Sequence, residues 1–212
     1  PLPSSAEGTL SSLAAYPVMD RISKSDVCLI GPGLGRTAHI REIVTSALKN
    51  SKIPLVLDAD GINVVAENIA VLDEAACPIV LTPHDGEFAR LAGFLPSDAP
   101  GGRLGAARRF AAEHGVVLVL KGHRTITALP DGSAYVNTTG GPAMAKGGSG
   151  DVLAGMITAF IAQRLPIKDA ALAAVYLHGL AGDIAARRLG EYSVTASAII
   201  EALPEAISSV IS

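Results

Sequence analysis

Four short apolar runs constrain the fold of this chain more than any other feature. Residues 26–30, 54–57, 78–81 and 116–120 are apolar at nearly every position, without polar alternation. Strands buried on both faces have this pattern, and they form parallel sheets covered by helices. Residues 37–49, after the first run, carry apolar side chains at helical spacing. The sequence therefore predicts an α/β fold with a mainly parallel central sheet.

The rest of the chain predicts a hairpin followed by helices. Two β-like runs, 124–129 and 133–138, flank the turn sequence Pro130-Asp131-Gly132. After Asp151 the chain is almost wholly helical in pattern, and Gly190 has the position of a helix C-cap. The predicted helices cover residues 152–164, 167–189 and 194–210.

Each of the four apolar runs ends in a polar or glycine-rich cluster. The clusters are Gly31-Pro32-Gly33-Leu34-Gly35, Asp58-Ala59-Asp60, Thr82-Pro83-His84 and Lys121-Gly122. In open parallel sheets ligands bind beyond the carboxyl ends of the strands. The shared position of these clusters predicts one binding site at that edge.

The segment Gly147-Gly148-Ser149-Gly150-Asp151 has the composition of an anion-binding loop. Glycines allow successive backbone N–H groups to converge, and the following helix adds its positive N-terminal end. Asp151 as a simple N-cap is the alternative, but an N-cap does not need three glycines before it. No Gly-Lys-Ser/Thr follows, so the segment is not a P-loop. The nearby Lys146 either reaches a phosphate or points to solvent.

Two further segments leave a structural and a functional interpretation open. The glycines of residues 31–35 either form a simple loop or let a bulky ligand approach the backbone. Arg36 stands where a dinucleotide fingerprint needs glycine, which argues against a Rossmann dehydrogenase. Residues 82–87 have two interpretations. In the structural one, Thr82 caps a helix, Pro83 lies in its first turn and Glu87 is a surface carboxylate. In the functional one, His84 donates to a substrate and Glu87 holds a hydrated Mg²⁺.

Composition excludes several classes of function. The chain has a net charge of −3 and no long basic run, so it is not expected to bind nucleic acid. Its longest apolar stretch, 152–161, is too short to cross a membrane. Cys28 and Cys77 lie in apolar runs without metal-ligand neighbours and are expected to be reduced, as in a cytoplasmic protein. Three histidines, His114, His123 and His178, lack zinc spacing and are interpreted as structural or surface residues.

Taken together, these motifs resemble one family. The glycine segment 31–35, Leu57-Asp58-Ala59-Asp60, the segment 81–87, Lys121-Gly122 and residues 144–153 are similar to those of the ADP/ATP-dependent NAD(P)H-hydrate dehydratases, members of the ribokinase-like superfamily. The resemblance implies a three-layer α/β/α fold and a single domain over residues 1–212 that lacks its N-terminal part. It also implies an NAD(P)H-hydrate epimerase as functional partner, in some proteins fused upstream. The Ala-rich helices predicted over residues 167–189 and 194–210 offer an apolar interface, from which we expect a homo-oligomer.

The resemblance further implies a reaction and a set of site residues. ADP, or ATP, would phosphorylate the hydroxyl of NAD(P)H hydrate, and loss of phosphate would restore NAD(P)H with AMP as by-product. Asp151 would be the catalytic base, with Gly33 and His84 also contacting the hydrate. Glu87 would organise Mg²⁺ through water. The nucleotide would contact Lys121, Gly122, His123, Arg124, Thr125, Gly147, Gly148, Ser149 and Gly150.

Other functions share parts of this pattern. A ribokinase-like kinase for a vitamin precursor such as hydroxyethylthiazole would carry a similar loop and aspartate, and the Thr-Pro-His-x-Gly-Glu segment is what favours the dehydratase. A catalytically silent nucleotide-binding module is the remaining alternative, and the presence of Asp151 argues against it.

Overall fold

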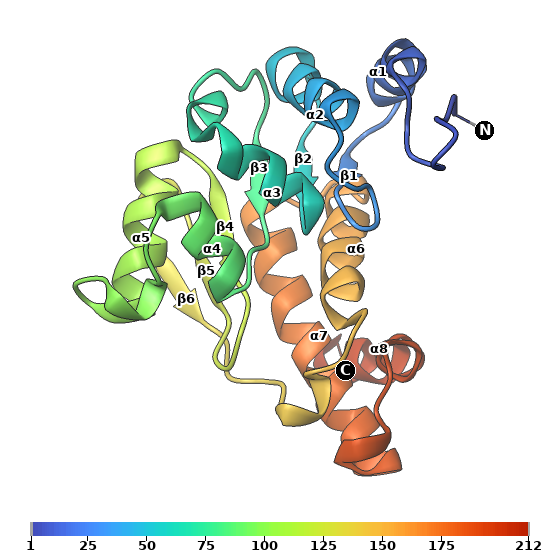
Figure 1. The fold of residues 1–212 in the computed structure, drawn as a ribbon. Helices are drawn as coiled ribbons and strands as arrows, with labels where there is room; N and C mark the ends of the chain where they lie inside the picture. The colour runs from blue at the N-terminus through green and yellow to red at the C-terminus, as the bar shows by residue number, and fades with distance from the viewer. Residues whose placement is uncertain (1, 212) are drawn as a thin grey trace.

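The computed structural model describes residues 2–211 and has a six-stranded sheet at its centre (Figure 1). Its strands lie side by side in chain order. The first four run parallel, and the last two form an antiparallel hairpin at the end of the sheet. The strands are β1 (Cys28–Ile30), β2 (Leu55–Leu57), β3 (Ile79–Leu81), β4 (Val117–Leu120), β5 (Ile126–Ala128) and β6 (Ala134–Val136).

Two groups of helices cover the two faces of this sheet. Parallel strands in sequential order, joined by right-handed crossovers, place every connecting helix on the same face. The connecting helices are α2 (Ala38–Asn50), α3 (Asp60–Glu67), α4 (Asp85–Ala92) and α5 (Gly102–His114), and α1 (Ala15–Ser23) packs on α2. The opposite face is covered by α6 (Ser149–Ala162), α7 (Ile167–Leu189) and α8 (Ala196–Ile211). Short 3-10 turns cover Ser12–Ala14, Ile69–Leu72, Pro96–Asp98, Pro142–Met144 and Glu191–Ser193.

Alternate side chains of each strand divide the apolar core in two. In β2, Leu55 and Leu57 belong to the core under α2–α5, whereas Val56 between them belongs to the core under α6–α8. β3 repeats this division, with Val80 facing α6–α8. Successive side chains of a strand point to opposite faces, so a strand between two helical layers must be apolar at every position. This requirement explains the uninterrupted apolar runs in the sequence.

The predicted elements are confirmed, with shifts at their ends. The strands are shorter than the apolar runs, and the hairpin closes with a hydrogen bond from the Leu129 N–H to the Ser133 carbonyl. The helix predicted from 152 begins three residues earlier, because Gly148 has a left-handed backbone (φ 85°) that ends the preceding loop. The last helix begins at Ala196, where the Thr195 hydroxyl caps it by accepting from the Ala198 N–H. None of the helices in the described part of the chain is long and apolar enough to cross a membrane.

The loops that follow β1 and β2 touch backbone to backbone. A Cβ at Gly61 would lie 2.5 Å from the Ile30 carbonyl oxygen, and a Cβ at Gly31 would collide with the Asp58 carbonyl. Gly31 also has φ 139°, which other residues rarely adopt. The two glycines therefore let α3 begin directly against the end of β1.

We expect Gly61→Ala to lower the free energy of unfolding by about 1–3 kcal/mol, because the new methyl group must push α3 away from β1. Gly155→Ala is the matched control, since a Cβ there meets nothing within 4 Å. That change inside α6 should raise the free energy of unfolding by roughly 0.5–1 kcal/mol. Urea unfolding of both variants measures the difference, and equal effects would contradict the interpretation.

Candidate functional site

A buried polar cluster lies where β2, β3 and β4 end. Asp58 follows β2 and is 1% exposed. Its Oδ1 accepts hydrogen bonds from the Thr82 hydroxyl at 2.8 Å and from the Lys121 ammonium at 2.6 Å. The same ammonium lies 3.8 Å from a carboxylate oxygen of the buried Glu87. Lys121 thus lies between two buried carboxylates, which offset the cost of removing its charge from water.

The glycine loop after β1 is held by the first residue of α3. One oxygen of Asp60 accepts from the Gly35 N–H at 2.8 Å, and the other accepts from Arg36 Nε at 3.1 Å. These hydrogen bonds lower the pKa of Asp60 against the opposing effect of its partial burial. Gly33 lies two residues before the first anchored position, with φ 68°, and a Cβ there would meet nothing within 4 Å. The backbone at Gly33 is therefore open to a ligand.

His84 caps α4, which corrects the alternative in which Thr82 caps the helix and Pro83 occupies its first turn. The helix begins at Asp85, and His84 Nδ1 accepts from the N–H groups of Gly86 and Glu87. Thr82 instead bonds to Asp58. Because Nδ1 is an acceptor, a neutral His84 carries its proton on Nε2. This nitrogen is the one that remains to donate to a ligand.

Glu87 completes this helix cap. Its Oε2 accepts from the His84 N–H at 2.9 Å, which forms a capping box. Its other oxygen, Oε1, lies 3.6 Å from His84 Nε2. The carboxylate is therefore held by structural contacts, and its burial corrects the alternative in which Glu87 is a surface carboxylate.

The predicted anion loop meets the buried cluster at Gly150. α6 begins at Ser149 and its N-cap, Gly148, offers no side chain to cap the helix. A Cβ at Gly150 would lie 3.3 Å from the Lys121 ammonium, so this ammonium lies against the start of α6. Asp151 is the third residue of the helix and is exposed, which excludes its interpretation as an N-cap. Uncapped N–H groups and an adjacent ammonium suit a phosphate.

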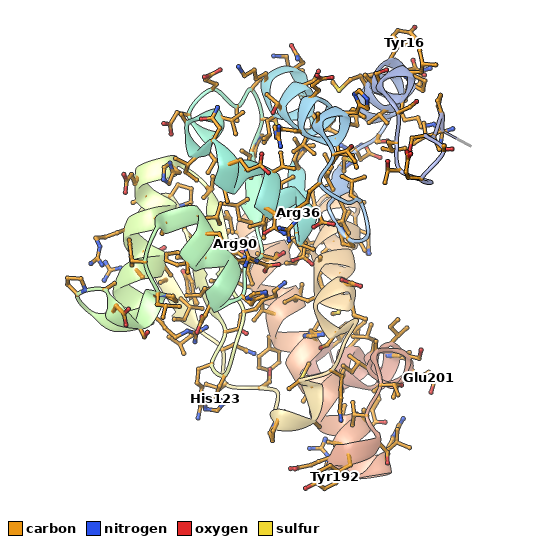
Figure 2. The ribbon with its side chains drawn as sticks, viewed as in Figure 1. Tyr16, Arg36, Arg90, His123, Tyr192 and Glu201 are labelled. Carbon is orange, nitrogen blue, oxygen red and sulfur yellow. The ribbon has the colours of Figure 1, made fainter. Side chains whose placement is uncertain are left out.

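A cavity of about 880 Å³ opens beside this junction. Lys121, Arg124 and Lys146 line it, and no Asp or Glu among residues 2–211 does. Figure 2 shows His123, another lining residue, at the tip of the loop between β4 and β5. The cavity therefore combines positive charge with an apolar part, as a nucleotide requires. Its apolar wall includes Met144, Leu153 and Val175.

The cavity brings together only part of the predicted site. His84, residues 121–125, Ser149 and Gly150 line it. The predicted residues that do not line it are Gly33, Glu87, Gly147, Gly148 and Asp151, although the last three each adjoin a lining residue in the chain.

Asp151 lines a separate hollow of about 440 Å³, whose wall is otherwise apolar and comes from α6 and α8. Asp151 thus lies on the first turn of α6, next to lining residues of the cationic cavity but outside that cavity.

Sequence reasoning missed the wall that α7 contributes. The loop before α6 lies directly on this helix, because a Cβ at Gly179 or Gly182 would collide with Thr139 or Met144. Asp183 then accepts from the Gly140 N–H at 2.9 Å. Small residues recurring at three-residue spacing on an otherwise apolar helix were the available signal.

His178 is buried, which agrees with a structural role and contradicts a surface position, and its place in the cavity wall was not predicted. Its Nε2 lies 3.4 Å from the hydroxyl of Ser149. Burial lowers the pKa of His178 to about 4, and a hydrogen bond with the Ser149 backbone offsets part of this effect. A neutral imidazole therefore contacts the first residue of α6 at neutral pH.

Comparisons with known proteins agree with this geometry. A family model described as NAD(P)H-hydrate dehydratase matches residues 4–205. The bifunctional NAD(P)H-hydrate repair enzyme Nnr of Moorella thermoacetica is 43% identical over 203 residues, which are 96% of this chain. The chain spans only 38% of that relative's length.

Solved structures show the same fold. An ADP/ATP-dependent NAD(P)H-hydrate dehydratase from Bacillus subtilis, co-crystallised with ATP and Mg²⁺, superposes with a TM-score of 0.76 at 32% identity, covering 89% of this chain and 68% of its own. A ribokinase-like superfamily protein from Enterococcus faecalis gives a TM-score of 0.79 at 33% identity, covering 93% and 68%. The ribokinase-like three-layer fold is therefore confirmed.

The buried His178 predicts a pH dependence of stability. Its folded-state pKa of about 4 lies below the ordinary 6.5, so between these values the unfolded chain binds more protons. The contribution is fully present above pH 6.5 and is lost as the pH falls to about 4. Over this pH range we expect the free energy of unfolding of the wild type to fall by up to roughly 3 kcal/mol more than that of His178→Gln. Urea unfolding at several pH values measures it, and parallel curves would refute it.

Proposed function

Because the chain belongs to the NAD(P)H-hydrate dehydratase family, we propose that it restores NAD(P)H from its hydrate at the expense of ADP. One observation carries the proposal. The exposed carboxylate of Asp151 lies on the uncapped first turn of α6, where the Lys121 ammonium and a cationic cavity meet. A base beside a phosphate-binding loop is the arrangement that phosphoryl transfer to a hydroxyl requires.

The proposed reaction replaces a poor leaving group by a good one. Asp151 removes the proton from the hydroxyl on C6 of the hydrated nicotinamide ring, and the oxygen attacks the β-phosphorus of ADP. The bond from that phosphorus to the bridging oxygen breaks, and AMP leaves. The ring nitrogen lone pair then expels phosphate as an iminium forms, and loss of the C5 proton gives NAD(P)H. The products are NAD(P)H, phosphate and AMP.

The residues around Asp151 have distinct parts in this proposal. The N–H groups at the start of α6, in residues 147–150, and the Lys121 ammonium stabilise negative charge on the transferred phosphoryl group. His84 Nε2–H donates to the hydrate, and the open backbone at Gly33 lets the ring approach. Residues 121–125 line the cavity and bind the nucleotide.

Glu87 is the residue proposed to organise Mg²⁺. Its Oε2 already accepts from a backbone N–H, and a lysine ammonium lies 3.8 Å away, so the carboxylate suits a hydrated cation better than direct coordination. Mg²⁺ would neutralise charge on the nucleotide phosphates. The Bacillus subtilis relative was co-crystallised with ATP and Mg²⁺, which supports including the ion.

The proposal extends to the partner, the location and the oligomeric state of the protein. Relatives of this chain are named as bifunctional repair enzymes, so we propose an NAD(P)H-hydrate epimerase as the functional partner. We also propose a cytoplasmic location, where the reduced cofactors are used. The exposed Tyr192 and Ile200 near and on α8 support a homo-oligomer.

Hydrated NADH and ADP, incubated with the protein, test the function directly. We expect the absorbance of reduced nicotinamide to return in proportion to the AMP formed, with no return when nucleotide is omitted. Absence of recovery with both ADP and ATP, in a protein that binds nucleotide, would overturn the proposal.

Asp151→Asn should lower turnover by about 10²–10⁴-fold, since it removes the base and keeps the shape. Affinity for ADP should change little, as measured by calorimetric titration. Asp169→Asn is the control, because Asp169 is another exposed aspartate in the first turn of a helix, α7. Unchanged turnover in Asp151→Asn would refute its assignment as the base.

A further inference from the structure

Arg103, at the start of α5, binds the loop after β4 from behind. Its Nη2 donates to the Lys121 carbonyl at 2.8 Å, and its Nη1 donates to the His123 carbonyl at 3.0 Å. Its Nε donates to Asp85 Oδ1 at 3.0 Å. One guanidinium therefore joins this loop to the first residue of α4. The planar fork of arginine allows such simultaneous contacts, which an ammonium cannot reproduce.

These contacts determine which way the loop's N–H groups point. In a trans peptide the C=O and the following N–H point in opposite directions, and the described chain has no cis peptide. When the carbonyls of Lys121 and His123 point to Arg103, the N–H groups of Gly122 and Arg124 must point away from it. The carbonyl between them, that of Gly122, accepts from the Thr125 hydroxyl at 3.1 Å. All three carbonyls of the turn are therefore bonded within the protein.

The N–H groups of the same turn have no protein acceptor. Among residues 2–211, no hydrogen bond is donated by the backbone N–H of Gly122, His123 or Arg124. All three residues line the cationic cavity. Backbone donors are almost always paired in a folded protein, with the protein, water or a ligand. Successive free N–H groups beside a lysine form a site for an anion.

The backbone of this turn has unusual conformations at two residues, and one of them makes room for the Arg103 guanidinium. Gly122 has φ 149°, and a Cβ there would lie 2.6 Å from Arg103 Nη2. Arg124 has φ 59°, in the left-handed region that non-glycine residues seldom occupy. The glycine at 122 is thus required by the guanidinium behind the loop, which is a protein contact and not a ligand contact. Strain of this kind persists only where surrounding contacts impose it.

We propose that Arg103 is a positioning residue that turns the N–H groups of Gly122 and Arg124 toward a phosphate of the bound nucleotide. This inference rests on the proposed function in taking the ligand to be ADP. Arg103 does not line the cavity and acts through the peptide groups that it orients. Its loss frees two carbonyls to rotate toward the ligand, where their negative ends would face the phosphate.

Nucleotide binding by three variants tests this assignment. In Arg103→Met we expect the Kd for ADP to rise about tenfold or more, because hydrogen bonds to a charged group are lost. The Kd for adenosine, which has no phosphate, should change less than twofold. Arg103→Lys should bind ADP with intermediate affinity, since an ammonium can still bond one carbonyl. Arg108→Met is the control on the same helix: Arg108 bonds the Gly132 carbonyl in the hairpin turn, and both Kd values should stay unchanged.

Gly122→Ala provides an independent route to the same outcome, because its methyl group displaces the Arg103 guanidinium. We expect selective loss of ADP affinity again, with thermal unfolding confirming that the variant is folded. Equal weakening of ADP and adenosine in the folded variants, or no weakening of either, would overturn the role of Arg103. Titrations do not require hydrate turnover. Failure of the dehydratase assay with normal ADP binding would therefore refute the proposed function and leave this inference standing.

Discussion

The ion pair between Lys121 and Asp58 is the interaction on which the site depends. Both groups follow central strands, and Asp58 is almost fully buried, so each needs the other as counter-charge. Breaking a buried pair by removing one partner typically costs about 3–5 kcal/mol. The Thr82 hydroxyl extends the pair to the end of β3, and the ammonium also lies against Gly150 at the start of α6. The contacts that fix the ends of the strands therefore also fix a positive charge at the anion loop.

Much of the fold and part of the site were predictable from the sequence, because they depend on local patterns. Apolar runs buried on both faces predict parallel strands, and polar clusters at their ends predict a common site. The roles of Arg103 and Asp183 were not predictable, since each bonds backbone atoms of a distant segment that carry no side-chain signal. The cap at His84 was missed for another reason. Histidine is not among the residues usually found at an N-cap, whereas Thr82 is of such a type.

Glycines that look equivalent in the sequence have different surroundings in the structure. Gly33 and Gly147 are open, and a side chain there would meet nothing within 4 Å. At Gly122 and Gly150 the free space is filled by Arg103 and Lys121, and Gly179 makes room for the loop before α6. The glycines of this region therefore differ in what lies beside them. Gly33 and Gly147 leave the backbone open, Gly122 and Gly150 admit a cation of the protein, and Gly179 admits another segment of the chain.

This difference bears on how phosphoryl transfer is arranged in the proposed reaction. Attacking and leaving oxygens lie roughly in line on opposite sides of the phosphorus, so donor and acceptor need separate approaches to one anion site. At the start of α6, Gly150 faces Lys121 in the wall of the cationic cavity, and Asp151 lines a different hollow. In the proposed reaction a single step along the helix therefore separates the ammonium that binds phosphate from the base, while His84, proposed to contact the hydrate, lines the cationic cavity with the nucleotide residues. Because Lys121 is held by buried carboxylates, its charge is in place before either ligand binds, and this lowers the reorganisation needed at the moment of transfer.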